Sequence, residues 1–180
     1  MVRVALQLQP MIFARPANLV EMEWSEIDFE NTQWIIPAEK MKMNDRHIVP
    51  LSKQAIELLQ EIQPLTGRGS YVFASNQGKI KTGHISRETP GAIIRRLGYK
   101  GVHTMHGFRT TASTMLHEKG FNSDMIERQL AHAERNSVKA AYCHAEYLPE
   151  RKKMMQVWSD YLDALKTGDN VIIGNFKRTG

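Results

Sequence analysis

Cysteine is almost absent from this sequence, since Cys143 is the only one among 180 residues. A single thiol cannot form an internal disulfide, and this sparing use of cysteine is typical of proteins in a reducing cytoplasm. Long hydrophobic runs are absent as well: no apolar stretch approaches the ~20 residues that a membrane-spanning helix needs. No signal peptide opens the chain. We therefore expect a cytoplasmic protein without a membrane segment.

Metal-binding motifs are also lacking. His103, His106 and His132 could together supply three imidazole ligands for zinc. However, the sequence has no H-E-x-x-H motif, no cysteine pair and no suitably spaced carboxylate beside them. Arg109 would also lie unfavourably close to a divalent cation. We therefore expect neither a metal nor another cofactor.

Negative charge is in short supply. The chain has 24 Lys and Arg residues against 19 Asp and Glu, a formal net charge of +5 and a pI near 9.4. Such an excess favours polyanionic partners, because Lys and Arg displace counterions from phosphates. A solvated basic surface without such a partner is the alternative, and charge alone does not decide between the two.

What is present is an ordinary globular composition, with 42% hydrophobic and 24% charged residues. Residues 3–14 are expected to form a helix interrupted near Pro10, and residues 84–97 a helix broken at Pro90. Three β-prone runs, at 23–27, 33–37 and 46–51, predict a small antiparallel meander. A further short strand is expected within 67–75. The other expected helices are 52–65 with Ser52 as its cap, 106–119 ending before Gly120, 123–132 with Ser123 as its cap, a short one from Asn136 or Ser137 to Tyr142, and 149–166.

These elements predict a single domain over residues 1–180, mainly α with a small three-stranded antiparallel sheet. Because the chain opens within a helical segment, we expect it to be an N-terminally truncated piece of a longer protein.

The stretch "HTMHGFRTTAST" at 103–114 concentrates basic groups at the start of a predicted helix. His106 and Arg109 are three residues apart and therefore neighbours on one side of it. Cations are unfavourable at a helix N-terminus, which already carries partial positive charge. A bound phosphate would remove this conflict. A solvated polar helix face is the alternative that the motif alone leaves open.

Several motifs occur together in a fixed order. They are "FARPANLVEMEWSEID" at 13–28, "MKMNDRHIVPLS" at 41–52, "HGFR" at 106–109, "LAH" at 130–132, "AAYCHAEYL" at 140–148 and "RKKMMQVWSDYLDAL" at 151–165. In this order and spacing the chain resembles the catalytic domain of the tyrosine recombinase (phage integrase) family, in particular integrases of prophages and genomic islands. The resemblance covers nearly the whole chain and implies that family's catalytic-domain fold.

The resemblance also implies a set of active-site residues. They are Arg15, Lys42, His106, Arg109, His132 and the nucleophile Tyr142. Lys40 is the nearby rival of Lys42, and Tyr147 is the competing phenol. Two arginines can clamp the non-bridging oxygens of a phosphodiester without a metal. A lysine can protonate the leaving 5′-oxygen, and a histidine can help to deprotonate the tyrosine.

One position departs from the family pattern. Three residues after Arg15 the family usually has Glu or Asp, whereas this sequence has Asn18. An acid there would brace the active-site cations, whereas asparagine keeps a hydrogen bond and loses the charge. The departure raises the alternative of a DNA-binding remnant with weakened catalysis.

The implied function is site-specific cleavage and rejoining of double-stranded DNA through a 3′-phosphotyrosine, to integrate or excise a mobile element. The implied partners are DNA attachment sites, a homotetramer in the synaptic complex and, as optional helpers, accessory DNA-bending proteins. The tail at 167–180 is expected to dock on a neighbouring protomer, and the enzyme is expected at the bacterial nucleoid. A type IB topoisomerase shares the chemistry and is the other alternative.

Overall fold

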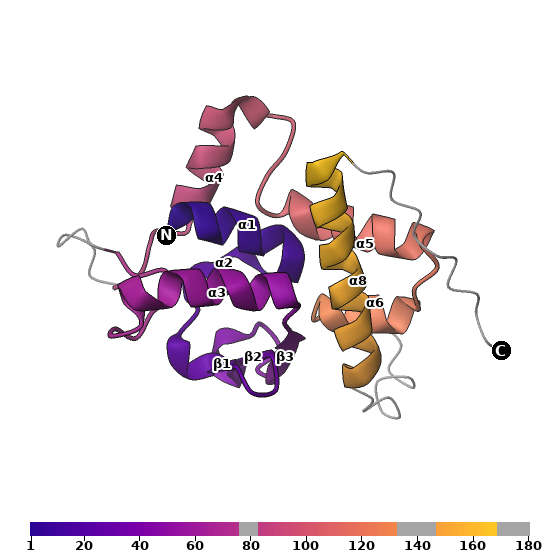
Figure 1. The fold of residues 1–180 in the computed structure, drawn as a ribbon, viewed down its shortest axis with the longest axis horizontal. Coiled ribbons are helices and arrows are strands. Elements are labelled where there is room, and N and C mark those ends of the chain that lie inside the picture. The colour runs from indigo at the N-terminus through magenta and orange to yellow at the C-terminus, as the bar shows by residue number, and fades with distance from the viewer. Residues whose placement is uncertain (76–82, 133–146, 169–180) are drawn as a thin grey trace.

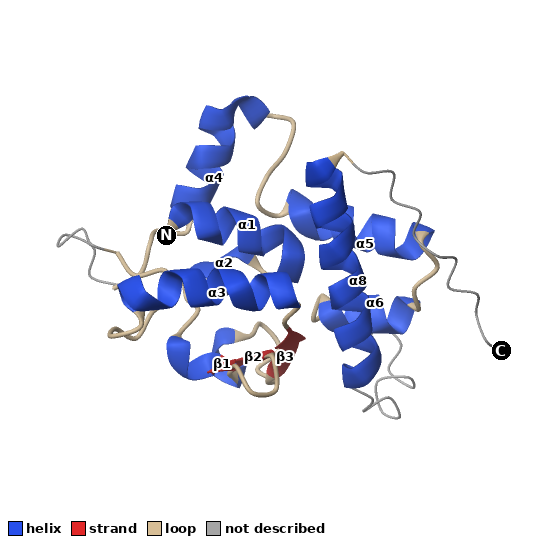
Figure 2. Ribbon diagram, in the orientation of Figure 1, coloured by secondary structure: helices blue, strands red, loops and turns tan. Residues whose placement is uncertain are grey.

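The computed structural model describes residues 1–75, 83–132 and 147–168. Figure 1 shows the path of the chain, and Figure 2 shows that the three short strands lie together below helix α3. The helices are α1 (Val2–Ile12), α2 (Pro16–Val20), α3 (Lys53–Thr66), α4 (Glu88–Ile94), α5 (Gly107–Glu118), α6 (Ser123–Gln129) and α8 (Leu148–Thr167). The short helical turns are η1 (Trp24–Glu26), η2 (Ala38–Lys40) and η3 (Arg95–Tyr99), and the strands are β1 (Ile27–Asp28), β2 (Gln33–Ile36) and β3 (His47–Pro50).

The sheet is a three-stranded antiparallel meander in the order β1-β2-β3, as predicted. Trp34 lies opposite Ile27 on one side and Val49 on the other, so the central strand places its indole in the core. The first predicted run was partly wrong, because 24–26 form the η1 turn before the strand begins. No strand forms at 67–75, where the structure has only isolated bridges of Tyr71 and Ala74.

Helix α1 continues through Pro10, so the predicted interruption was wrong. A proline inside a helix typically costs about 3 kcal/mol. Burial offsets this cost, since six of the eleven residues of α1 are buried. The carbonyl of Pro10 is also used, because the indole nitrogen of Trp158 in α8 donates to it at 2.7 Å.

Two other predicted helix boundaries also needed correction. Helix α4 begins at Glu88, which places Pro90 in its first turn, where a missing N–H breaks no helical hydrogen bond. The cap of α6 is Asn122 rather than Ser123, because the Asn122 side chain accepts from the Asp124 amide. Gly120 does follow α5 in the left-handed region, as predicted. The helix expected between residues 136 and 142 lies outside the described residues.

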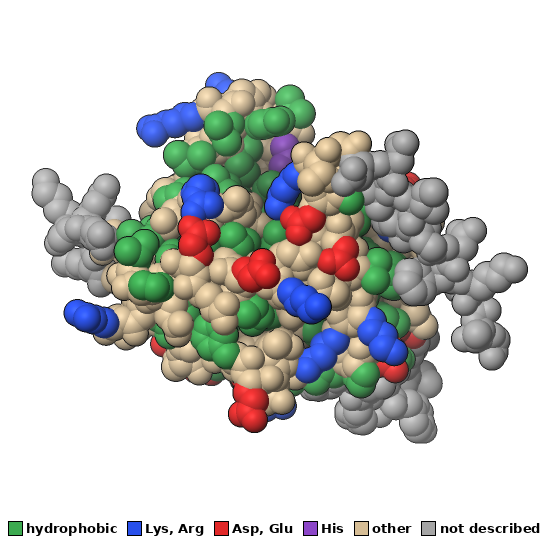
Figure 3. All heavy atoms as spheres, viewed as in Figure 1, with side chains coloured by type: hydrophobic (Ala, Val, Ile, Leu, Met, Phe, Trp, Pro, Cys, Tyr) green, Lys and Arg blue, Asp and Glu red, His purple; other side chains and the backbone are tan. Residues whose placement is uncertain are grey.

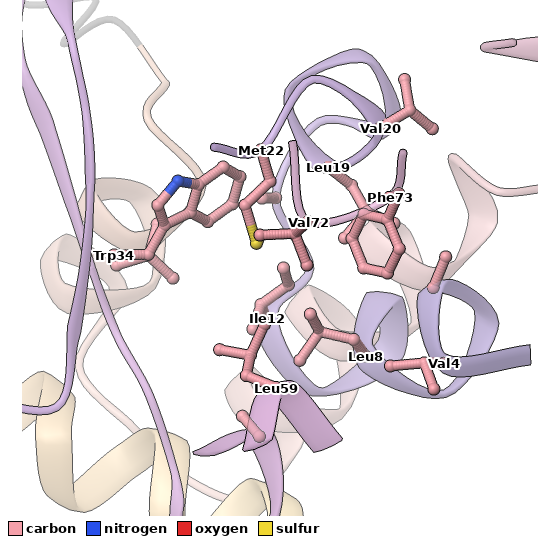
Figure 4. Close-up of a cluster of buried hydrophobic side chains, with 14 of the residues drawn as sticks. Val4, Leu8, Ile12, Leu19, Val20, Met22, Trp34, Leu59, Val72 and Phe73 are labelled. Carbon is pink, nitrogen blue, oxygen red and sulfur yellow. The ribbon is translucent and has the colours of Figure 1, made fainter. Parts of the chain in front are cut away.

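Two hydrophobic cores make up the interior. The larger one joins α1, α2, α3 and the sheet, and Figure 4 shows Leu8, Met22, Trp34 and Leu59 converging within it. The smaller one joins α5, α6 and α8, which lie side by side in Figure 1. Phe13 links them, because it ends α1 but packs edge-on against Trp158 in the second core. The candidate site lies at this junction.

Acidic and basic side chains are interspersed on the face in Figure 3, so this face carries no continuous basic patch. Within the described part of the chain, no helix combines the length and apolar character needed to cross a membrane.

Candidate active site

The C-terminal end of α6 forms the floor of the site. The amide of Ala131 donates to the carbonyl of Arg128, and the amide of His132 donates to that of Glu127. These two bonds form a Schellman motif, which requires a left-handed residue at its centre. Ala131 takes that conformation with φ 50°. The motif turns the chain sharply, so that consecutive carbonyls and the His132 side chain face the same region.

Arg109 binds two of the carbonyls that meet at the junction of the cores. One of its terminal nitrogens donates to Phe13 O at 2.6 Å and the other to Leu130 O at 2.8 Å. The residue is only 4% exposed, whereas its helical neighbour His106 is exposed. The guanidinium is thus fixed in direction by α1 and α6 together.

Arg15 approaches the same floor from the other side. It precedes α2, and its terminal nitrogen donates to the carbonyl of Ala131 at 3.1 Å. Arg15 and Arg109 therefore occupy adjacent carbonyls, those of Ala131 and Leu130. Residues 94 positions apart in the sequence are brought together by the end of one short helix.

Two guanidinium groups in one place repel each other. Burial, followed by the charge of Arg15, lowers the pKa of Arg109 to about 10, while Glu127 opposes the shift. Arg109 therefore remains protonated near neutral pH, but burial and the charge of Arg15 make its protonated form less favourable than it would be in water. The carbonyls at the end of α6 supply partial negative charge that offsets part of this repulsion. An anion bound between the two arginines would relieve the rest.

His132 and His106 complete the described part of the site. The Nε2 atom of His132 lies 3.5 Å from a terminal nitrogen of Arg109, and its Nδ1 lies 2.7 Å from a carboxylate oxygen of Glu127. His106 is the exposed N-cap residue of α5. Both histidines and Arg109 line an open pocket of about 220 Å³. The hydroxyl side chains Thr110, Ser113 and Thr114 of α5 and Leu130 line it as well.

The two candidate lysines have different environments. Lys40 is held by the Glu21 carbonyl at 3.0 Å, by Glu23 at 2.6 Å and by an ion pair with Glu26. Burial alone would lower the pKa of Lys40, but the hydrogen bonds of the two carboxylates outweigh it and raise that pKa above its ordinary value. Lys42, by contrast, is exposed on the turn that leads into β3. Lys40 is therefore a structural residue, and Lys42 stays the better candidate for a proton donor.

A shell of buried polar residues supports α6 from behind. Gln129 donates to Ile12 O at 3.3 Å and accepts from Arg151 at 2.7 Å. Arg151 is almost fully buried and also donates to Ile48 O. The ring nitrogen Nε2 of His47 donates to the Gln129 carbonyl at 3.2 Å. Together they tie α6 to α1, β3 and α8.

The sequence-based reasoning found three of the residues that meet here, Arg15, Arg109 and His132, together with His106 on the pocket wall. Lys42 is not among the residues that line the pocket. Tyr142 lies outside the described residues. Within the described ranges no cluster of three or more His, Cys, Asp or Glu residues could hold a metal ion. His103 instead packs its ring against Phe108, with 4.4 Å between the ring centroids.

Glu127 and the supporting shell were missed. A spacing of five residues does not make neighbours on a regular helix, so nothing in the pattern linked Glu127 to His132. Recognising "LAH" as a helix end with a left-handed residue could have revealed the link.

Two arginines and a histidine held at the end of one helix form a cationic site of the kind that suits an oxyanion such as phosphate. Residues 2–148 match the family model described as the phage integrase family, so the chain belongs to that family. The prophage integrase IntA of Escherichia coli strain K12 is 41% identical over 171 residues, which cover 94% of this chain and 41% of IntA. The chain spans about two fifths of the length of the curated relatives it matches.

Solved structures show the same fold. The integrase from mycobacterium phage Brujita aligns with a TM-score of 0.66 at 16% identity, over 86% of this chain and 50% of that one. The Tn1549 transposon integrase in complex with circular intermediate DNA aligns with a TM-score of 0.51 at 18% identity, over 85% of this chain and 56% of that one. The mainly helical fold with a small antiparallel sheet is therefore the fold of integrases and recombinases, as predicted.

Proposed function

We propose that this chain is the catalytic domain of a site-specific DNA recombinase, which cleaves and rejoins DNA through a 3′-phosphotyrosine to integrate or excise a mobile element. The observation that carries the proposal is the pair of guanidinium groups of Arg15 and Arg109 on the adjacent carbonyls of Ala131 and Leu130. Their mutual repulsion, and the position of Arg109 in the wall of the pocket, favour a phosphodiester as the occupant.

The chemistry requires a nucleophile, charge neutralisation and a proton for the leaving group. In the proposed reaction, the phenol oxygen of Tyr142 bonds to phosphorus while the bond to the 5′-oxygen breaks. Arg15 and Arg109 stabilise the charge on the non-bridging oxygens. Lys42 gives its proton to the 5′-oxygen, and a histidine of the pocket takes the phenol proton.

The assembly is also part of the proposal. Residues 1–180 are proposed as a single catalytic domain of a longer protein, with partner domains that complete the grip on DNA. The substrate is a pair of double-stranded attachment sites joined in a homotetrameric synapse, with accessory DNA-bending proteins as helpers. We place this reaction in the bacterial cytoplasm, at the nucleoid. The tail at 167–180, mostly outside the described residues, is proposed to dock on a neighbouring protomer.

Covalent trapping tests the proposal. A duplex that carries a candidate attachment site, with a nick close to the cleavage point, loses a short fragment on cleavage and leaves the protein attached. This nicked substrate should become covalently joined to the chain without added metal. Tyr142→Phe should abolish the adduct and leave DNA binding unchanged. Tyr147→Phe is the matched control and should still form the adduct.

The other outcomes identify the alternatives. DNA binding without any adduct would indicate a remnant with decayed catalysis. An adduct that forms equally on unrelated duplexes, with relaxation of supercoils by a monomer, would indicate a type IB topoisomerase. An adduct that is lost only in Tyr147→Phe would move the nucleophile to that residue.

A further inference from the structure

We infer that Gln129 is a positioning residue for Arg109. Its side chain fixes the end of α1 against the end of α6, and it thereby sets the separation of the two main-chain carbonyls that Arg109 bridges. The role deepens the proposed function, because it assigns a residue outside the pocket to the alignment of the arginine pair. It rests on the proposed function only for the identity of the ligand.

The end of α1 offers three consecutive carbonyls, and each of them accepts from a side chain. The three pairs are Gln129 to Ile12 O at 3.3 Å, Arg109 to Phe13 O at 2.6 Å and Gln9 to Ala14 O at 2.8 Å. The helix ends at Phe13, whose left-handed conformation, with φ 34°, turns the chain. Side chains therefore satisfy the carbonyls that the end of this helix leaves without main-chain partners.

The end of α6 is arranged in the same way. The three pairs here are His47 to Gln129 O at 3.2 Å, Arg109 to Leu130 O at 2.8 Å and Arg15 to Ala131 O at 3.1 Å. Arg109 is the middle donor in both sets, so its guanidinium joins the two helix ends. Because that group is planar and rigid, it can make both bonds only while the two carbonyls keep a fixed separation.

Gln129 makes a second link beside the one made by Arg109. Its own backbone directly precedes Leu130, and its side chain reaches Ile12, which directly precedes Phe13. The two links therefore join the same helix ends, one residue apart at each. Gln129 is only 1% exposed, so solvent would not replace a lost amide hydrogen bond there.

Arg151 at the start of α8 fixes the direction of the Gln129 amide. Two nitrogens of Arg151 donate to Gln129 Oε1, at 3.1 and 2.7 Å. A guanidinium has only donors, so it must meet the oxygen of the amide, and Nε2 is then left to face Ile12 O. A glutamate at position 129 would keep the contacts with Arg151, but its second oxygen would face Ile12 O without a hydrogen between them.

The separation of the carbonyls affects what Arg109 can bind. The bonds to Phe13 and Leu130 use two of the five N–H groups of a guanidinium, and the others are those that an oxyanion could meet. Loss of one bond would let the guanidinium rotate, so its remaining N–H groups would no longer converge with those of Arg15. A misplacement of about 1 Å at such a site can cost about 10²-fold.

The guanidinium is tested first, without a ligand. In ¹⁵N NMR of the unaltered chain at low temperature, the two terminal nitrogens of Arg109 should give separate signals, because each is bonded to a different carbonyl. In Gln129→Glu these signals should merge, while the indole signal of Trp34 in the larger core should stay in place. Gln60→Glu makes the same change at an exposed position of α3 and should leave the Arg109 signals separate.

Binding of inorganic phosphate is tested second, by titration of the same signals. Gln129→Glu should raise the dissociation constant by about 10- to 10²-fold, and Gln60→Glu should leave it unchanged. Gln129→Met removes the amide without adding a charge and should weaken binding as well. A loss confined to Gln129→Glu would attribute the effect to the added charge and would overturn the inference.

Two further results would overturn it. One is a single averaged signal for the terminal nitrogens of Arg109 in the unaltered chain, a test that requires no variant to fold. The other is a Gln129→Glu chain that keeps both the separate signals and the phosphate affinity. If the signals behave as expected but the unaltered chain binds no phosphate, the proposed ligand is refuted and the positioning role of Gln129 stands.

Discussion

The side-chain amide of Asn18 donates a hydrogen bond to the main-chain carbonyl of Lys40 at 2.9 Å. Asn18 is buried, and its partner lies in the η2 turn from which the Lys42 segment emerges. The residue that departs from the family pattern therefore supports the hairpin, and a carboxylate could not replace it there because it has no hydrogen to donate.

Replacing Asn18 by the acid usual in the family should accordingly be harmful. Asn18→Asp would place a buried carboxylate against the Lys40 carbonyl, so that two acceptors would face each other without a hydrogen between them. This should destabilise the protein by about 1–3 kcal/mol. Asn18→Ala, which loses the hydrogen bond without adding charge, should cost less. Urea unfolding at pH 7 measures both. An aspartate variant more stable or faster in joining than the unaltered chain would show that position 18 acts on the arginines instead.

Sulfur substitution in the DNA can identify the general acid. Lys42→Ala should cleave ordinary DNA about 10²–10⁴-fold more slowly, because an alkoxide is a poor leaving group. A 5′-bridging sulfur leaves without a proton and should restore the rate. Arg109→Ala should stay defective on both substrates, since the charge on the non-bridging oxygens is then no longer neutralised by this arginine. Single-turnover cleavage of the two substrates measures this.

Lys40→Ala is the control for that experiment. Its ammonium stabilises Glu23 and Glu26, so its loss should reduce stability, and sulfur should not rescue cleavage. Rescue of Lys40→Ala and not of Lys42→Ala would assign the acid to Lys40. Rescue of neither would remove this hairpin from the proton step.

Ala131 pays a conformational cost that glycine avoids. The left-handed region costs an L-residue roughly 1–2 kcal/mol. Ala131→Gly should therefore stabilise the protein by about 1 kcal/mol and raise Tm by roughly 2–4 °C. Ala92→Gly, inside helix α4, should destabilise the protein, because glycine there raises the conformational entropy of the unfolded chain and relieves no strain in the folded one. A lower Tm for Ala131→Gly in calorimetry would contradict the assigned turn.

His47 makes stability depend on pH. Burial, followed by the charge of Arg151, lowers its pKa to about 3 from an ordinary 6.5. The unfolded chain therefore binds more protons between these values, so this contribution is complete above pH 6.5 and is lost as pH falls toward 3, by at most about 1.4 kcal/mol per pH unit. His47→Gln should flatten the slope of the unfolding free energy between pH 4 and 6.5. An NMR titration of His47 centred near 6.5 would refute the burial argument.

Much of the fold was accessible to prediction because its signals are local. The meander, the helix capped by Ser52 and the helix that ends before Gly120 all follow from periodicity and caps within a few residues. The errors at Pro10 and Pro90 arose because the rule that proline breaks a helix considers only the local sequence, whereas the outcome depends on burial and on the position of the proline within the helix. Burial of α1 outweighed one lost hydrogen bond, and Pro90 lies in a first turn, where none is lost.

The sequence by itself determined the family and the chemical identity of the candidate groups, because ordered short motifs survive without knowledge of their neighbours. The tertiary structure decided how those groups are held. Arg15 and Arg109 meet only because the carbonyls at the end of α6 face the end of α1, and those ends adjoin only when the two cores pack together. Glu127 reaches His132 only through a left-handed turn. Side-chain directions at such junctions depend on contacts between distant segments, which no local pattern encodes.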